Sequence, residues 1–426
     1  MNALLRTKAE TTVTASRPQE AELIAEQPFL QRTSGQVQVA LLTGGWDKPY
    51  ALGLTEALVA QGSFVDFLGT EEVDAPELHN NPRINFVKLQ NAPRRGGGAL
   101  DKALRTLSYY WRTLRYTFSS RALVFHVLWN TKFLIFDRTL LLFFYKLLGK
   151  RLVFTAHNVN AGKRDGNDTW LNRLTLRIQY RLVDHIFVHT KKMKEELVID
   201  FQTPETKVSV IPFGINNTVP KTRLTNAQAR EELKLRTADK IMLFFGNVTP
   251  YKGLDYLIQA FDIVCDGNED YRLVIAGKPS PDAAYFEGIK NRISSSAWKS
   301  RIITRFEYIP DEETETYFKA ADVVILPYVH IFQSGVLFLS YSFGLPVIAT
   351  DVGSLREDII EGQTGFTCRP MDPVDLSKVI ESHFSSELFS DLDRHRREIR
   401  AFASERYSWS KVSEITRSVY SRLLQK

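Results

Sequence analysis

The sequence contains few cysteines and no long uncharged apolar segment. Only two of its 426 residues are cysteine, Cys265 and Cys368, which is too few for a disulfide framework and fits a reducing compartment. The most apolar stretch, residues 132–154, is interrupted by Asp137 and Arg138. A transmembrane helix needs about 18 or more apolar residues without charges, so we predict none.

Other signals that would assign the protein to a class are also missing. Residues 1–36 lack the apolar segment of a signal peptide and show little periodicity, so we expect a flexible N-terminal tail and a cytoplasmic protein. No His, Cys or carboxylate grouping has the spacing of metal ligands, and no nucleic-acid-binding motif occurs. We therefore expect no metal site, no cofactor and no nucleic-acid partner.

What the sequence does contain is a long alternation of strand and helix patterns. Hydrophobic residues make up 44% and charged residues 24% of the chain, as in soluble globular proteins, and the length favours roughly two to three domains. Short apolar runs occur at 37–43, 64–69, 84–89, 122–129, 151–156, 185–190 and 207–213, with helical patterns at 101–119, 132–148 and 169–182. This alternation predicts a doubly wound parallel sheet, a Rossmann-like α/β domain, at 37–215.

The pattern breaks near residue 216 and then restarts. Further apolar runs lie at 240–246, 271–277, 301–307, 322–328 and 346–352, separated by helical patterns near 254–265, 282–296, 312–320 and 335–343. We predict a linker at 216–238, a second Rossmann-like domain at 239–406, and a terminal helix at 407–426 that packs back toward the first domain. Ligands of such sheets bind at the carboxyl ends of the strands, so we expect the two domains to face one another across a cleft.

Two loops in the second half have the form of phosphate sites. In the first, a strand ends at Gly246 and Lys252-Gly253 opens the next helix. Unpaired N–H groups at a helix N-terminus attract anions, and a lysine adds charge for the same anion. The alternative is an ordinary strand–loop–helix connection with a surface lysine.

The second loop is Gln333-Ser334-Gly335-Val336, which follows another strand and precedes another helix. Gly335 permits a close backbone approach, and the N–H groups of Gly335 and Val336 suit a second phosphate. The alternative is a plain helix cap at Ser334.

Taken together, the motifs resemble those of GT-B glycosyltransferases, in particular the retaining family 4 (glycosyl transferases group 1). The matching pieces in the second half are FGNVTPYKG, VIAGKP, RFEYIPDEET, DVVILPY, QSGVLFLSYSFGLPVIATDVGSLRE and EGQTGF. The first half matches through LLTGGW, TAHNV, DHIFVHT and VIPFGIN. The resemblance covers residues 37–425 and implies a GT-B architecture, with 37–215 as the acceptor-side domain and 239–406 as the nucleotide-sugar-binding domain.

The resemblance also implies roles for particular residues. Lys252 corresponds to the basic residue on the donor diphosphate, and His157 to a histidine near the transferred sugar; these two are the candidate catalytic residues. The other implied donor-binding residues are Gly44 and Gly45, Asn247 (where the family usually has arginine), Glu307, Tyr308 and Ile309 at the base-binding segment, and Gln333, Ser334, Gly335 and Val336.

One departure from the family pattern concerns its paired glutamates. Their positions are occupied by Ile331 and Leu339, and no acidic residue lies between Asp322 and Asp351. We interpret this QSGV-type variant as divergence. The resemblance then implies metal-independent, retaining transfer of a sugar, of the hexosyltransferase type, from a nucleotide diphosphate to a glycan or lipid-linked acceptor, in cell-surface polysaccharide or glycolipid biosynthesis. A non-catalytic nucleotide-sugar-binding partner and a GT-B epimerase remain as alternatives.

Charge is distributed unevenly along the chain. The net charge is +6, yet residues 91–200 carry twenty basic and eight acidic side chains, a net charge of +12 that leaves −6 for the rest. Aromatic residues accompany the basic ones, as in LSYYWRTLRYTF at 107–118. Such a segment is typical of peripheral contact with an anionic membrane, here the inner face. The alternative is a solvated basic face over buried aromatic side chains.

Overall fold

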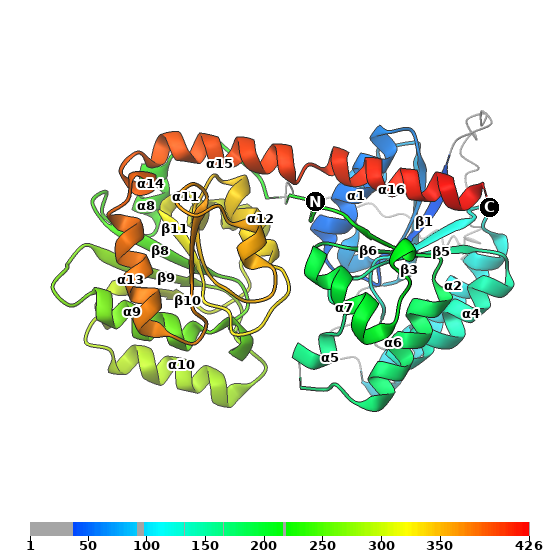
Figure 1. Ribbon diagram of the computed structural model, residues 1–426, viewed down its shortest axis with the longest axis horizontal. Coiled ribbons are helices and arrows are strands. Elements are labelled where there is room, and N and C mark those ends of the chain that lie inside the picture. Colours follow the sequence, from blue (N-terminus) through cyan, green and yellow to red (C-terminus); the bar gives the residue numbers. More distant parts are fainter. Residues whose placement is uncertain (1–36, 92–97, 132, 165, 216–218, 426) are drawn as a thin grey trace, which may run out of the picture. The chain divides into compact units, whose positions relative to one another are not determined.

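A computed structural model describes residues 37–91, 98–131, 133–164, 166–215 and 219–425 (Figure 1). The predicted tail at 1–36 lies outside these residues. Two parallel sheets dominate the described chain, one of seven strands and one of six. The prediction of two doubly wound α/β domains is thereby confirmed.

The first sheet is built from the predicted apolar runs of the N-terminal half. Its strand order is β3-β2-β1-β4-β5-β6-β7, and every neighbouring pair is parallel. The order runs outward from β1 in both directions, as in Rossmann-like sheets. The strands are β1 Gln38–Leu42, β2 Phe64–Thr70, β3 Ile84–Gln90, β4 Val124–Val127, β5 Arg151–Thr155, β6 His185–Val188 and β7 Val208–Val210.

Helices cover this sheet. They are α1 Lys48–Ala60, α2 Ala99–Ser119, α3 Leu134–Phe136, α4 Leu142–Leu147, α5 Ala161–Arg164, α6 Trp170–Leu182 and α7 Lys191–Phe201. A π-helical turn at Asp137–Leu141 joins α3 to α4. The helix predicted over 132–148 is thus continuous but irregular from Leu134 to Leu147, and residue 132 lies outside the described residues. Buried Asp137 accepts hydrogen bonds from the Thr131 N–H and the Tyr110 hydroxyl, both at 2.7 Å, which holds this turn against α2.

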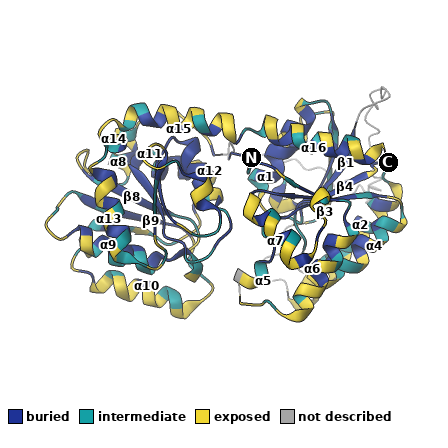
Figure 2. Cartoon of the chain, in the orientation of Figure 1, coloured by how far each residue is buried: buried dark blue, intermediate teal, exposed yellow. Residues whose placement is uncertain are grey.

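The second sheet has the order β10-β9-β8-β11-β12-β13. Its strands are β8 Lys240–Phe245, β9 Tyr271–Ala276, β10 Ile302–Arg305, β11 Val323–Leu326, β12 Val347–Thr350 and β13 Gly365–Cys368. The helices of this half are α8 Asn226–Glu232, α9 Leu254–Val264, α10 Ala283–Ser295, α11 Asp311–Ala320, α12 Gly335–Ser342, α13 Pro373–Phe384, α14 Glu387–Ser390 and α15 Leu392–Arg406. In both sheets the inner strands are buried and the edge strands β3, β7 and β10 are partly exposed, whereas most helices expose their outer faces (Figure 2).

Two segments outside the central pattern tie the chain together. Within 216–238, α8 begins at a Thr225 capping box, and Ala229 and Leu235 pack in the core of the second sheet, so this part of the expected linker belongs to that core. The terminal helix, α16 Trp409–Leu424, packs on α1, and its Val412 and Tyr420 lie in the core of the first sheet. The last helix therefore completes the domain that begins the chain.

Candidate nucleotide-sugar site

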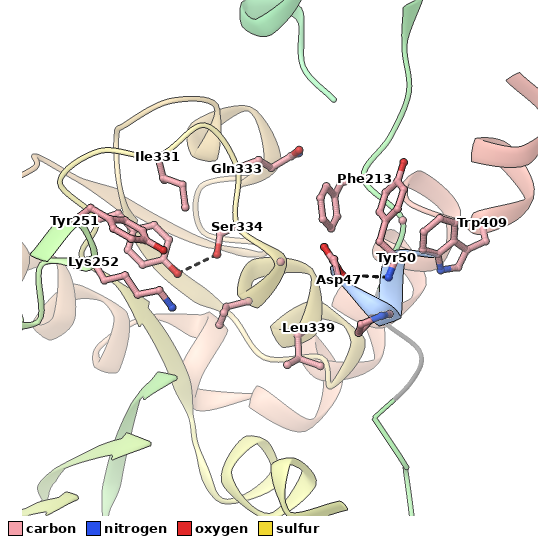
Figure 3. Close-up of a pocket in the computed structure, with 15 residues that line it drawn as sticks. Asp47, Tyr50, Phe213, Tyr251, Lys252, Ile331, Gln333, Ser334, Leu339 and Trp409 are labelled. Carbon is pink, nitrogen blue, oxygen red and sulfur yellow. Dashed lines mark hydrogen bonds between the residues drawn. The ribbon is translucent and has the colours of Figure 1, made fainter. Parts of the chain in front are cut away.

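A pocket of about 380 Å³ is lined by residues that follow strands of both sheets (Figure 3). This volume is in the range of small-molecule sites, about 300–1,000 Å³. The first half and the terminal helix contribute Asp47, Pro49, Tyr50, Phe213, Gly214 and Trp409; the second half contributes Tyr251, Lys252, Tyr328, Ile331, Gln333, Ser334, Gly335, Val336 and Leu339. The pocket thus brings together the two loops that the sequence singled out as phosphate sites.

Among the described residues that line the pocket, Lys252 is the only basic one, and it is buried. It ends a turn after β8, where Gly253 has φ +65° and a Cβ would stand 2.0 Å from the Pro327 carbonyl oxygen. Its ammonium lies 3.5 Å from the Phe245 carbonyl and 5.7 Å from the Tyr328 ring centre, and no carboxylate of the described residues forms an ion pair with it. Burial lowers the pKa of Lys252 to about 8.

A second buried lysine shows how different Lys252 is. The Lys150 ammonium donates to the carbonyls of Ser120 and Ala122 at 2.8 and 2.9 Å and lies over the Phe125 ring, so its hydrogen bonds are largely satisfied within the fold. Lys252 has one long contact instead. A buried cation is costly without a partner, and this arrangement is suited to an anion that enters the pocket.

The N-terminus of α12 opens onto the same pocket. The Ser334 side chain makes no capping hydrogen bond, because its hydroxyl pairs with the Tyr328 hydroxyl at 3.0 Å. The Gln333 amide donates to Asp358 at 3.1 Å, whereas its Oε1 is buried without a partner among the described residues. A Cβ added at Gly335 would meet nothing within 4 Å. The first N–H groups of α12 are therefore left for a ligand rather than for a side-chain cap.

The wall beside these groups is apolar where the family pattern has glutamates. Ile331 and Leu339 both line the pocket, and only 9% and 6% of their surfaces are exposed. Asp47 is the only carboxylate among the lining residues. It caps α1 by accepting from the Tyr50 N–H, and burial raises its pKa to about 6. Sequence reasoning missed Asp47, although an Asp two residues before Pro49 is a recognisable helix start.

Gly44 and Gly45 precede this cap but do not line the pocket. Their φ values are +62° and +79°, and a Cβ at either would come within 2.8 Å of an oxygen of Trp129 or Thr70. These glycines are thus required by the turn after β1. That turn directs the chain to Asp47 and Tyr50, which do reach the pocket.

His157 lies behind the pocket wall, in contact with Tyr50. Its ring stacks on Trp129 at 4.1 Å and meets the Tyr50 ring edge-on at 4.6 Å. Its Nδ1 is 3.1 Å from His189 Nε2, and His189 Nδ1 faces the Ile211 carbonyl at 3.4 Å. Burial lowers the pKa of His157 well below its usual range and that of His189 to about 4, so both rings are neutral at pH 7.

The carbonyl fixes the tautomers of this histidine pair. Because a carbonyl only accepts, the proton of His189 belongs on Nδ1, which makes its Nε2 an acceptor for a proton on His157 Nδ1. His157 Nε2 is then a lone-pair acceptor, and it is buried with no partner among the described residues. His157 Nε2 can therefore accept a hydrogen bond from a hydroxyl group.

Besides Gly44 and Gly45, four more of the predicted donor-binding residues do not line the pocket. Asn247 is exposed, Glu307 pairs with Arg305 at 2.6 Å, and 69% of the Tyr308 surface is accessible. Ile309 is buried in the core of the second sheet. Within the described residues there is also no cluster of three His, Cys, Asp or Glu side chains placed to hold a metal ion.

Comparison with known proteins agrees with this arrangement. Residues 225–405 match the description "Glycosyl transferases group 1", and residues 49–218 match "Glycosyltransferase Family 4". The chain carries glycosyltransferase domains in both halves, and the second is a group 1 domain. The two matches cover the two sheets in turn, so the assignment rests on both halves of this group 1 protein.

Curated relatives share part of their length with this group 1 protein. A D-inositol 3-phosphate glycosyltransferase of Corynebacterium diphtheriae is 29% identical over 283 residues, which is 63% of this chain and 64% of the relative. One of Streptomyces avermitilis is 25% identical over 249 residues, 57% of this chain and 52% of the relative. The chain therefore spans between half and two thirds of these relatives.

Solved structures show the same fold over nearly the whole chain. Sucrose-phosphate synthase from Thermosynechococcus elongatus has a TM-score of 0.71 at 18% identity, covering 92% of this chain and 99% of its own. Anabaena HepE, solved with UDP and glucose, has a TM-score of 0.68 at 16% identity, covering 91% and 99%. The GT-B architecture of this group 1 protein is confirmed by these likenesses.

Proposed function

We propose that the protein transfers a sugar from a nucleotide diphosphate donor to an acceptor, with retention of configuration. The observation that carries this proposal is the pairing, on one pocket wall, of the buried Lys252 ammonium with the uncapped N-terminus of α12. Both groups attract anions, and together they are suited to a diphosphate. UDP and glucose bound to Anabaena HepE, a protein of the same fold, are consistent with such a donor.

In this reaction negative charge builds on the diphosphate as the bond from sugar C1 to the phosphate oxygen breaks. The Lys252 ammonium and the N–H groups of Gly335 and Val336 stabilise that charge, and such preorganised groups usually supply the largest single catalytic effect. The new bond forms between C1 and the acceptor oxygen on the same face, and the acceptor proton leaves with the phosphate. Paired carboxylates are not required, which fits Ile331 and Leu339 on this wall.

Donor binding is tested by thermal shift with UDP-, GDP-, ADP- and dTDP-sugars. A ligand that binds the native state raises Tm, by the equivalent of about 2.7 kcal/mol at 100 times Kd. We expect one nucleotide class to raise Tm and the free monosaccharides to leave it unchanged. A flat response to all four nucleotide classes would contradict the proposal.

Turnover is expected to be independent of divalent metal ions. In this proposal Lys252 and the N-terminus of α12, which both line the pocket, stabilise the charge on the diphosphate. Release of nucleotide from the donor identified above should therefore proceed at the same rate in excess EDTA. Loss of turnover that Mg²⁺ or Mn²⁺ restores would show that a metal ion shares this role.

The acceptor is proposed to be a glycan or a lipid-linked molecule at the inner face of the membrane, in cell-surface polysaccharide or glycolipid synthesis. The basic segment at 91–200 supports this choice. Because several relatives are named D-inositol 3-phosphate glycosyltransferases, that compound belongs in the acceptor panel beside oligosaccharides and polyprenyl-linked sugars.

A second candidate function is a non-catalytic nucleotide-sugar-binding partner of another transferase. The observation that favours it is the apolar pair Ile331 and Leu339, which leaves Asp47 as the only carboxylate among the described residues of the pocket wall. Donor binding without transfer, donor hydrolysis or epimerisation in any assay would support this alternative. Interconversion of two donor sugars without an acceptor would instead indicate an epimerase.

A further inference from the structure

Helix α2 exposes an apolar stripe and turns tyrosine and threonine side chains inward. The residues that α2 buries are Tyr109, Thr113 and Thr117. Its large exposed residues are Leu100, Leu104, Leu107, Trp111 and Phe118, which recur every three, four or seven positions and so form one stripe. More than half of each of these five side chains is accessible. In a helix that packs only on its own domain, the apolar stripe faces the core instead.

Specific contacts on the inward face of α2 fix the orientation of the helix on its domain. The Tyr116 hydroxyl donates to Asp66 at 2.7 Å, and the Tyr110 hydroxyl donates to Asp137 at the same distance. The threonine hydroxyls donate to carbonyls of the preceding turn. A rotation that buried the leucines would break the two tyrosine contacts, which reach outside α2.

The apolar surface continues onto the neighbouring helical segment. Phe118 of α2 meets Phe144 of α4 at 5.2 Å between ring centres. On that segment Leu140, Phe143 and Leu147 are each more than half exposed. We call these three residues and the five of the α2 stripe the α2–α4 face. A shallow groove lined by Trp111, Leu114, Arg115, Phe118 and Ser119 lies on it.

Positive charge surrounds the α2–α4 face. Helix α2 itself has four basic residues and one acid, Asp101. Lys102, Arg115 and Arg121 are exposed, and no carboxylate of the described residues forms an ion pair with them. Arg105 and Arg112 donate to the carbonyls of Asn91 and Lys88 at the neighbouring sheet edge. A partner of this face must therefore be both apolar and anionic.

We infer that the α2–α4 face docks on the surface of an anionic lipid bilayer. Leucine and aromatic side chains reach the acyl boundary, and arginine and lysine stay at the phosphates, as in other helices that lie in the plane of a membrane. A second copy of the chain fits less well, because pairing two α2 helices brings two sets of like charges together. No helix within the described ranges is long and apolar enough to span a bilayer, so this is surface contact.

The inference deepens the proposed acceptor but does not rest on sugar transfer, because it is tested by vesicle binding alone. The protein is sedimented with vesicles of phosphatidylcholine, with and without one third phosphatidylglycerol. Binding to the anionic vesicles is expected, weaker at ~0.5 M NaCl because the charges are screened. Lys102→Glu/Arg115→Glu should lower the partition coefficient by at least about 25-fold, from about fivefold per basic residue lost.

The apolar stripe is tested by Leu107→Ser/Trp111→Ser, with an expected loss of about tenfold or more in partition coefficient. Matched controls lie on the second half: Ile263→Ser/Val374→Ser removes exposed apolar residues, and Arg292→Glu/Lys299→Glu reverses exposed charges. Both controls should bind as the wild type does. All variants should keep the Tm rise with UDP-glucose, or with whichever donor the panel identifies, which separates docking from the donor site.

Three outcomes would overturn the inference. The first is that the wild type does not bind anionic vesicles, and the second is that the Leu107→Ser/Trp111→Ser variant binds them as well as the wild type does. The third is that sedimentation equilibrium without lipid shows a dimer that this variant abolishes. The last result would assign the face to a second copy of the chain.

Discussion

Lys252→Ala should reduce kcat/KM for the donor by about 10²–10³, the usual effect of removing one group that stabilises a developing oxyanion. No other basic residue of the described chain lines the pocket, so none of these neighbours can replace Lys252. Initial rates of nucleotide release at several donor concentrations measure the effect. The matched control is Lys150→Ala, another buried lysine, whose bonds to Ser120 and Ala122 lie in the first domain. It should lower Tm but leave donor kinetics unchanged.

Lys252 also determines in which direction donor affinity changes with pH. With a pKa of about 8 in the free protein, the ammonium is lost as pH rises above 8, and donor affinity should fall by up to about tenfold per pH unit. The stability of the free protein should change in the opposite direction, because the unfolded lysine keeps its proton to a higher pH than the folded one. In Lys252→Met both dependences should weaken. A donor affinity that is flat across pH 8 in the wild type would contradict a role for this ammonium.

Gly335→Ala is expected to weaken donor binding at least tenfold while leaving the free protein as stable or more so. A Cβ at Gly335 meets nothing within 4 Å, and replacing a helical glycine by alanine stabilises by about 0.4–1 kcal/mol where the backbone permits it. The space that the glycine leaves is therefore on the ligand side of the pocket wall, where a methyl group separates a phosphate from the α12 N–H groups. Donor titration by calorimetry and Tm without ligand are the two measurements.

Gly288→Ala is the control for this change. Gly288 lies in α10 and also has nothing within 4 Å of an added Cβ, but it is not part of the pocket. It should show the gain in Tm without the loss of affinity. Equal donor affinity in Gly335→Ala and the wild type would mean that the donor does not approach α12.

The sequence predicted those parts of the molecule that depend on local pattern. Lys252 and Gly335 stand at strand–turn–helix junctions marked by glycine, so both the elements and the helix ends that line the pocket could be located in advance. Asp47 and Trp409 could not, because they come from segments more than 300 residues apart and meet only through packing. The basic and aromatic segment at 107–118 could be located as well, but the outward direction of its apolar stripe could not. Periodicity indicates that a helix has an apolar side but does not say whether that side is covered.

Asn247, Glu307 and Tyr308 illustrate a different limit. Their assignment came from position in a family motif, and position fixes a backbone location but not where a side chain points. In the structure Glu307 turns to Arg305, within its own segment. The pocket wall instead includes Tyr251, Tyr328 and Phe213, which have no charge or spacing that would mark them as ligand-binding in a sequence.

The packing of α16 on the first domain also affects how the protein is made. Trp409 fits against Gly53 and Gly214 and donates to the Ile215 carbonyl at 2.8 Å. The first domain is synthesised before α16, so it lacks this part of its core until α16 has been synthesised. At about 5–20 residues per second, the 190 residues from Val219 to Ser408 take about 10–40 s to synthesise. During that interval the groove for α16 is open to chaperones, and a ribosome that stops before Trp409 leaves a first domain that has no means of closing it.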